Sequence, residues 1–166
     1  MTVQLRRRVL DLSSDGFGFW LAGLIDGEGS FTITPNRPGF TCRLTLGLRD
    51  DDSEILTEIR DRTGLGRVLL HKRSGGNRQP LSLWRVERKA DCQALCAILD
   101  AFPLRSKKSK DYAIWREAVD LMAAMTGAVG PGQPRDWSAV AELKEKLADV
   151  RRHPNLLQQS RMAGSP

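Results

Sequence analysis

The sequence predicts an α+β chain in which four antiparallel strands form one saddle-shaped sheet, followed by an extra C-terminal helix. Two observations predict this fold. Apolar residues switch between helical steps of three or four and strand steps of two, and each pair of strand-like segments is joined by a turn rich in Gly, Pro or Asn. The resulting order is αββαββα. We divide the chain into a core, residues 1–126, and an extension, residues 127–166.

The first half of the core is expected to contain a helix, a hairpin and a second helix. Residues 16–27 carry apolar side chains at helical spacing. From residue 30 the period changes to two, and residues 35–39 form a turn signal before a strand over residues 41–49. Residues 52–63 then predict an amphipathic helix that begins with acidic side chains and ends before Gly64.

The second half of the core repeats the pattern. Strands are expected over residues 67–73 and 81–88, and helices over residues 90–101 and 108–125. A Gly- and Pro-rich connector, residues 127–134, precedes one more amphipathic helix, which contains Trp137, Leu143 and Val150. A polar tail follows from about His153.

Charge is segregated along the chain, and an anionic partner is therefore expected. The net charge is +6, and residues 66–89 carry seven basic residues against the single acid Glu87. A second acid-free cluster lies at residues 105–110, whereas residues 50–61 are acidic. Two solvated faces are the alternative explanation. Segregation on strand-like sequence favours nucleic acid.

Several classes of protein are excluded. The longest apolar stretch, Phe17 to Ile25, is far short of the ~20 residues that a membrane-spanning helix needs. The N-terminus does not have the form of a secretory signal. We therefore expect an intracellular protein that is not secreted and has no membrane partner. Three cysteines without C-x-x-C spacing do not suggest zinc or disulfides, and predict buried free thiols.

The segment Leu21 to Gly29, LAGLIDGEG, carries the chemistry. Its small residues allow a second helix to approach closely. Each glycine costs up to ~1 kcal/mol of helix stability relative to Ala, so these glycines need a compensating contact. Asp26 and Glu28 lie where the helix ends. A carboxylate beside the negative end of a helix is unfavourable without a cation, and carboxylate and carbonyl oxygens suit Mg²⁺. An ordinary glycine-terminated helix with solvated acids is the alternative.

This segment resembles the LAGLIDADG signature of homing endonucleases, with Gly27 in place of Ala and Glu28 in place of Asp. The αββαββα order and the later Pro-Leu-x-x-Lys-Lys, Pro103 to Lys108, extend the resemblance over residues 17–125. The resemblance implies that the motif helices of two copies pack side by side. The acid at Glu28 of each copy would then bind a divalent metal, Mg²⁺ or Mn²⁺, with the Gly27 carbonyl as a further ligand.

The motif occurs once in this chain, which implies a homodimer and a near-palindromic DNA target. The predicted dimer interface contains Ala22, Gly23, Asp26 and Gly27. By the same resemblance, Lys107 is the expected catalytic lysine, with Lys108 adjacent to it as a DNA contact. The family's other polar active-site position falls near Leu48 or Arg49, and Arg49 is the residue that could serve.

The polar face of the predicted strands would lie in the major groove, where base edges can be distinguished. Alternation selects the following residues for DNA contact, with Arg78 at a turn: Thr32, Thr34, Arg43, Thr45, Arg67, His71, Arg73, Arg78 and Arg85. β-Propensity alone would also explain the threonines. The arginines are the better candidates, because they can bind guanine or phosphate.

The leading functional hypothesis is a sequence-specific, divalent-metal-dependent DNA endonuclease of the intron-homing kind. It would make a staggered double-strand cut in double-stranded DNA and need no small-molecule cofactor beyond the metal. A non-cleaving binder on the same fold, an intron maturase or a transcription regulator, is the alternative. A generic RNA-binding domain is less favoured, because aromatic residues are only 6% of the chain and Glu28 would remain unexplained.

Overall fold

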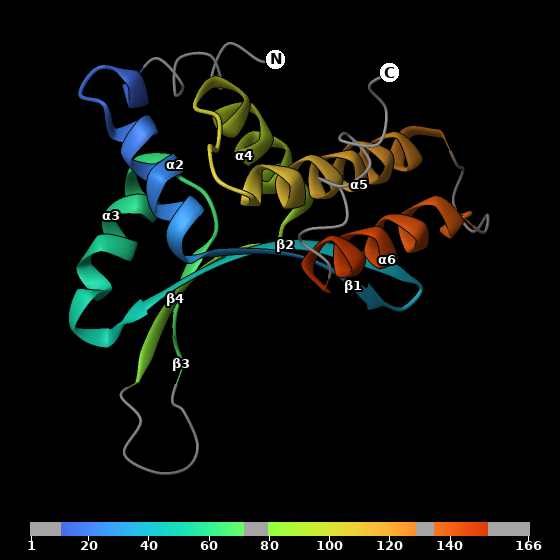
Figure 1. Ribbon diagram of the computed structural model, residues 1–166, viewed down its shortest axis with the longest axis horizontal. Helices are drawn as coiled ribbons and strands as arrows, with labels where there is room; N and C mark the ends of the chain where they lie inside the picture. The colour runs from blue at the N-terminus through green and yellow to red at the C-terminus, as the bar shows by residue number, and fades with distance from the viewer. Residues whose placement is uncertain (1–10, 72–79, 129–134, 153–166) are drawn as a thin grey trace, which may run out of the picture.

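A computed structural model describes residues 11–71, 80–128 and 135–152 of the chain. Four antiparallel strands form one sheet in the order β1-β2-β4-β3. Their bounds are β1 Gly29–Asn36, β2 Gly39–Arg49, β3 Arg67–His71 and β4 Leu81–Val86. The sheet is curved, and the helices lie on one side of it (Figure 1). The other face carries no helix of the described chain and is called the open face below.

The helices confirm the predicted order. They are α2 Phe17–Glu28, α3 Ser53–Thr63, α4 Lys89–Ala101, α5 Lys108–Ala128 and α6 Ser138–Arg152. A short 3₁₀ helix, η1 Asp50–Asp52, precedes α3, and residues 11–13 are also helical. The predicted α+β fold with a four-stranded antiparallel sheet and a C-terminal helix is therefore confirmed.

Several element boundaries differ from the prediction: β2 begins at Gly39, and α5 continues to Ala128, into the first two residues of the predicted connector. Strand β1 continues through Pro35 to Asn36, where a turn was predicted. Proline is tolerated there because β1 is an edge strand, so the missing N–H costs no ladder hydrogen bond. Strand β4 ends at Val86, two residues before the predicted end, because α4 begins at Lys89.

The core lies between the sheet and the helices. Its largest fully buried side chains include Trp84, Trp115 and Phe31, and burial of each such side chain stabilises the fold by roughly 1.5–3 kcal/mol. The Trp84 indole N–H donates to the Leu65 carbonyl at 2.8 Å. The next residue, Gly66, has φ +67°, and a Cβ there would overlap the Arg85 carbonyl oxygen. This glycine therefore lets the chain after α3 turn closely against β4.

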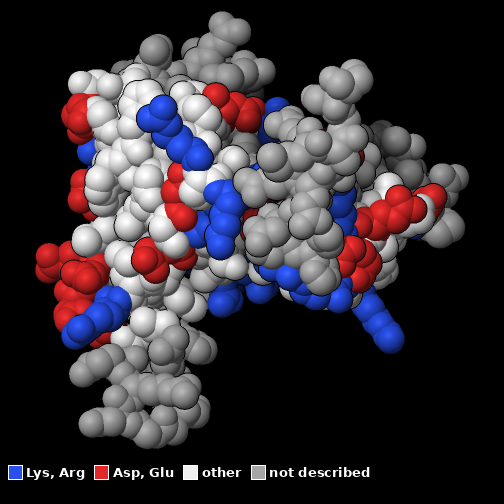
Figure 2. All heavy atoms as spheres, viewed as in Figure 1, with Lys and Arg blue, Asp and Glu red and all other residues white. Residues whose placement is uncertain are grey.

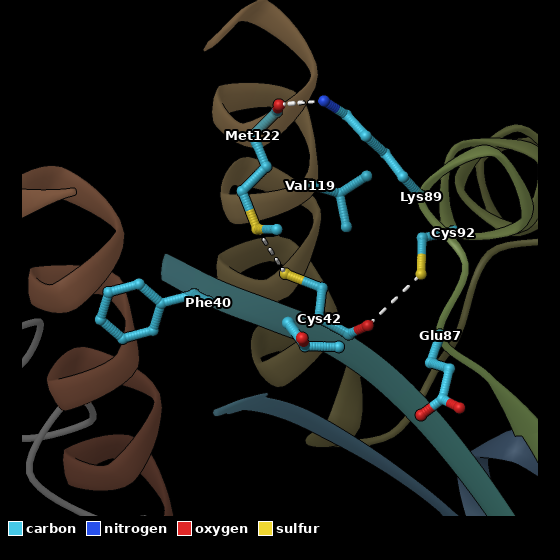
Figure 3. A pocket seen from close by; sticks show the side chains of 8 residues that line it. Phe40, Cys42, Glu87, Lys89, Cys92, Val119 and Met122 are labelled. Atoms are coloured by element: carbon cyan, nitrogen blue, oxygen red, sulfur yellow. Dashed lines mark hydrogen bonds between the residues drawn. The ribbon is translucent and has the colours of Figure 1, made fainter. Parts of the chain in front are cut away.

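All three cysteines are buried free thiols, as predicted. Cys42 of β2 and Cys92 of α4 line a pocket of ≈ 210 Å³ that is closed on the α5 side by Val119 and Met122 (Figure 3). The Cys42 thiol donates to the Met122 sulfur at 3.6 Å. Burial raises the pKa of each thiol to about 12. These thiols are therefore protonated at neutral pH and pack as small apolar groups.

Helix α6 packs on α5 and along β1 (Figure 1). At one end of this contact the Trp137 and Phe40 ring centroids are 6.0 Å apart, with their planes tilted by 50°. The indole covers Gly39, where a Cβ would overlap it. At the other end Arg151 reaches the first turn of α5 and the start of β1. The C-terminal helix therefore borders the outer edge of the sheet. None of the helices in the described part of the chain is long and apolar enough to cross a membrane.

Candidate active site

The motif helix α2 passes into strand β1 without an intervening loop. Gly29 is both the C-cap of α2, with its N–H donating to the Ile25 carbonyl, and the first residue of β1. A Cβ at Gly29 would lie 2.7 Å from the Ile25 carbonyl oxygen, so a larger residue would force the helix end to shift. Glu28, the last residue of α2, is exposed. The acid predicted to bind metal is therefore fixed at a helix–strand junction.

Asp26 ties this junction to the loop before α5. One of its carboxylate oxygens accepts the Arg105 and Ser106 backbone N–H groups at 2.7 and 3.1 Å, and the other accepts the Ser106 hydroxyl at 2.8 Å. Hydrogen bonds to a carboxylate are stronger than those between neutral groups. Asp26 therefore fixes the start of α5 against the end of α2, across 79 residues of sequence.

This attachment brings Lys108 to the motif. The Lys108 ammonium donates to the Gly27 carbonyl at 3.1 Å. Burial lowers the pKa of Lys108, and three neighbouring carboxylates oppose that shift: those of Asp26, Glu28 and Asp111. Lys108 was predicted as a DNA contact and Lys107 as the catalytic lysine. In the described chain the exposed Lys107 side chain makes no hydrogen bond or ion pair. The lysine that the structure brings to the motif, near Glu28, is Lys108.

Arg151 of α6 is a neighbour of this site that the sequence did not indicate. Its guanidinium pairs with Asp111 at 2.8 Å and donates to the Phe31 carbonyl in β1. Arg151 also contributes to the lowered pKa of Lys108. No local pattern could have found it, because it lies 120 residues from Phe31 in a helix whose only sequence feature is amphipathicity.

Arg49, the other predicted catalytic residue, lies at the end of β2. Gly29, at the helix–strand junction, pairs with Leu46 of β2. Arg49 lies three residues farther along β2 than Leu46, so it is displaced from the junction. Its side chain is exposed and pairs with Asp51 at 2.9 Å. Within the described residues, no hydrogen bond or ion pair joins Arg49 to Glu28 or Lys108.

One side of α2 is uncovered. A Cβ added at Gly23 or Gly27 would meet nothing within 4 Å, and both glycines are exposed. Phe19 and Trp20, at helical spacing from Gly23, are 64% and 43% exposed. We call these four residues the open face of α2. Of the other predicted interface residues, Ala22 is 4% exposed and packs in the chain's own core, and Asp26 is half-buried against the α5 loop.

Metal ligands are few in one copy of this chain. Of the oxygens at the junction, the exposed Glu28 carboxylate accepts no hydrogen bond in the described chain, whereas both Asp26 oxygens and the Gly27 carbonyl already accept one. Across the described residues, no group of three or more His, Cys, Asp or Glu side chains could hold a metal ion. Mg²⁺ requires six oxygen ligands but usually keeps several waters, so one carboxylate per copy fits a site completed by a second copy and by substrate.

The strand register places most predicted DNA contacts together on the open face of the sheet. Thr32 is the partner of Arg43, and Arg85 is the partner of both Thr45 and Arg67. Thr34 lies opposite Thr41 on the same strands. Lys and Arg side chains line the lower side of the sheet, whereas Asp and Glu gather around the start of α3 (Figure 2).

Three predicted contacts cannot be placed. His71 is the last residue of β3, and its side chain is not described. Arg73 and Arg78 lie outside the described residues.

The comparisons with known proteins agree with this geometry. The sequence model of a family described as LAGLIDADG endonuclease matches residues 21–119, from the motif to α5. The chain belongs to the LAGLIDADG endonuclease family. The motif occurs once in this chain, at residues 21–29.

Relatives of this LAGLIDADG chain carry two kinds of name. One, "Probable intron-encoded endonuclease Cox1-I1b" of Schizosaccharomyces pombe, is 32% identical over 113 residues, which are 64% of this chain and 28% of that protein. Another, "Intron-encoded RNA maturase bI4" of Saccharomyces cerevisiae, is 48% identical over 48 residues, 29% of this chain and 7% of that protein. The chain therefore corresponds to less than a third of either relative.

Among solved structures, the LAGLIDADG meganuclease I-AabMI bound to uncleaved DNA is similar with a TM-score of 0.56 and 28% identity. The match covers 64% of this chain and 37% of that chain. The predicted family and fold are thus confirmed.

Proposed function

We propose that this chain is a divalent-metal-dependent, sequence-specific DNA endonuclease that acts as a homodimer in intron homing. The observation that carries the proposal is the exposed Glu28 carboxylate at the end of a motif helix whose small-residue side is uncovered, beside Lys108. Membership of a family of endonucleases supports cleavage as the activity. The product would be a staggered double-strand break.

The open face of α2 supports the homodimer. Two glycines with no neighbour within 4 Å leave room for the backbone of a second helix, and each costs up to ~1 kcal/mol of helix stability that such a contact would offset. Phe19 and Trp20 add exposed aromatic surface beside them. A second copy of the same helix would cover this face and bring a second Glu28 to the same centre. Two-fold symmetry then requires a near-palindromic target.

The residues at the junction fit a Mg²⁺ or Mn²⁺ site. Glu28 from each copy would hold the metal, and the Gly27 carbonyl would join it only if the Lys108 ammonium, which donates to that carbonyl here, moved away. The metal would stabilise the attacking water and the leaving oxygen. Glu28 lies at the negative end of the α2 dipole, where a cation offsets an otherwise unfavourable carboxylate. Lys108 is held 3.1 Å from the Gly27 carbonyl, so its charge can stabilise the phosphorane. We therefore assign the catalytic lysine to Lys108.

The open face of the sheet would bind the duplex. It carries Arg43, Arg67 and Arg85 on neighbouring strands, and the chain has a net charge of +6. Paired strands can enter the major groove, where each base pair presents a distinct pattern. The similarity to a DNA-bound meganuclease supports DNA as the ligand.

A second candidate function is that of an intron maturase, which binds intron RNA without cutting DNA. The specific observation in its favour is the 48% identity over 48 residues to an RNA maturase. The two functions differ in what they require of Glu28. Cleavage needs its carboxylate, whereas RNA binding on the sheet does not.

The test is an in vitro cleavage selection. Wild-type protein, Glu28→Gln and the control Glu117→Gln, which changes an exposed glutamate on α5, are incubated in Mg²⁺ with a randomised, partially palindromic duplex library, and the cut ends are sequenced. Symmetric staggered ends from wild type and Glu117→Gln alone would support the endonuclease. Enrichment of bound duplex without cleavage would support a DNA binder, and binding of intron RNA alone would support the maturase.

A further inference from the structure

An acidic residue lies on the face that is proposed to bind DNA. Glu87 follows Val86, the strand partner of Leu44, and therefore lies opposite Arg43 on the open face of the sheet. Arg43 Nε donates to one Glu87 carboxylate oxygen at 2.9 Å, and the Arg67 guanidinium donates to the other oxygen. The Glu87 side chain is only 23% exposed. One carboxylate therefore holds arginines from two different strands, β2 and β3.

The strand register explains why an acid is useful there. Arg67 is the direct partner of Arg85, and like charges directly opposite in a sheet repel. Glu87 lies two residues from Arg85 on the same face, so it offsets this repulsion and draws Arg67 away from Arg85. We call Arg43, Arg67 and Arg85 the arginine triad. The Glu87 carboxylate reduces the charge repulsion among them and so allows them to lie close together.

The third member of the triad has a donor without an acceptor. Arg85 Nε is buried and has no hydrogen-bond partner, and no ion pair among the described residues includes Arg85. Arg85 borders a hollow of ≈ 160 Å³ whose other lining residues are Gly66, Arg67, Glu87, Arg88 and Asp91. An unsatisfied donor beside a hollow favours a ligand that presents acceptor atoms.

The presence of Glu87 argues for base edges over phosphate as that ligand. Phosphate binding depends on net positive charge, and a carboxylate within the triad removes one unit of it. Guanine is neutral and presents two acceptors, O6 and N7, which a guanidinium fork can bind at once. Such a contact depends on orientation, and an arginine that is already restrained loses less freedom on binding. Both oxygens of Glu87 are occupied, so Glu87 itself would not contact a base.

We infer that Glu87 is a positioning residue that orients Arg43 and Arg67 of the arginine triad to bind guanine in the major groove of the target. This inference rests on the proposed DNA binding but not on cleavage. It identifies a chemical feature of the substrate, namely guanines in the part of each half-site that lies beneath the triad. It also assigns a role to the single acid within the basic segment of residues 66–89.

The experiment measures binding without metal, in EDTA, so that no DNA is cut. A duplex from a bound-site selection is compared with the same duplex carrying 7-deazaguanine, which lacks N7, at one guanine per half-site in turn. The proteins are wild type, Glu87→Gln, Arg43→Lys and the control Glu117→Gln, which makes the same change of charge on α5. Thermal unfolding of each variant checks that it is folded.

The expected result is that wild type and Glu117→Gln lose about tenfold or more in affinity at one or two 7-deazaguanine positions. Glu87→Gln and Arg43→Lys should lose most of that discrimination. Glu87→Gln should bind a random duplex at least as well as wild type, with a steeper dependence on salt. Arg43→Lys keeps the charge and tests orientation even if Glu87→Gln fails to fold.

Two results would overturn the inference. Wild type could be indifferent to 7-deazaguanine at every position, or Glu87→Gln could retain full discrimination. Failure of the proposed function is a different result. Absence of any duplex binding by wild type would remove the DNA-binding proposal itself, whereas binding without cleavage would leave the role of Glu87 intact.

Discussion

The helix–strand junction at Glu28 and the open face of the sheet are built in different ways. The side chains of the open face are placed by strand register, in which each residue is positioned by its neighbours two residues away and across the ladder. The junction is assembled by hydrogen bonds from segments far apart in sequence, Asp26 with the α5 loop and Arg151 with β1. We therefore expect the open face of the sheet to tolerate changes of side chain and the junction to depend on each of its contacts.

The largest expected effect concerns the open face of α2. Gly23→Val should prevent close approach of a second helix and so abolish dimerisation and double-strand cleavage. Sedimentation velocity measures the oligomeric state. A dimer formed by this variant would contradict the proposed packing. Glu117→Gln, which changes an exposed residue of α5 outside the open face of α2, should behave as wild type.

The two adjacent lysines provide a sharper test of the junction. Lys108→Met should reduce single-turnover cleavage by about 10²–10³-fold, because a preorganised charge near the phosphorane is lost. Lys107→Met should change the rate only a few-fold, since that side chain is exposed and makes no contact within the described chain. Equal losses, or a larger loss for Lys107, would show that the catalytic lysine is misassigned.

The buried side of the sheet predicts a dependence of stability on pH. The folded-state pKa of the three thiols is raised to about 12 from 9.0, so the folded chain holds protons that the unfolded chain releases above pH 9. The free energy of unfolding should therefore fall between pH 9 and pH 12, by up to about 1.4 kcal/mol per thiol per pH unit. Urea titrations at pH 8 and 10 measure this. A Cys42→Ala variant should show a smaller decrease.

Removal of the anchor between α2 and α5 should have a moderate effect. Asp26→Ala leaves the Arg105 and Ser106 N–H groups without their acceptor and should destabilise the chain by about 1–3 kcal/mol. It should also reduce cleavage, because Lys108 would no longer be held at the junction. Thermal unfolding and single-turnover kinetics measure the two effects. Unchanged cleavage would show that the loop before α5 positions Lys108 without Asp26.

The smallest effect is expected at the contact between α6 and β1. Arg151→Met should lower the free energy of unfolding by about 1 kcal/mol, because its partner Asp111 and the Phe31 carbonyl lose a donor. Arg152→Met is the matched control, since Arg152 is exposed and pairs only with Asp149 among the described residues. Equal stability of the two variants would show that the contacts of Arg151 with Asp111 and Phe31 do not stabilise the fold.

The comparison also explains what could be predicted from the sequence. Alternation and turn signals predicted the sheet and the open-face positions of Thr32, Arg43 and Arg85, because strand geometry is local. Lys107 was predicted to act beside the motif acid, whereas the structure holds Lys108 at the Gly27 carbonyl, and this choice depends on how Asp26 fixes the loop before α5. Arg151 left no signal at all. In the dimer prediction, Ala22 was placed at the interface because small size does not reveal which side of a helix faces the core.

Gly29 belongs at once to the cap of α2 and to strand β1, so no flexible linker separates the proposed cutting acid from the proposed reading surface. Any substitution that tilts β1 to accommodate a new base pair must also displace Glu28. In an effort to retarget this protein, affinity for the new site and the rate of cutting should therefore change together. Substitutions on β3, at the opposite edge of the sheet, should separate the two properties most easily.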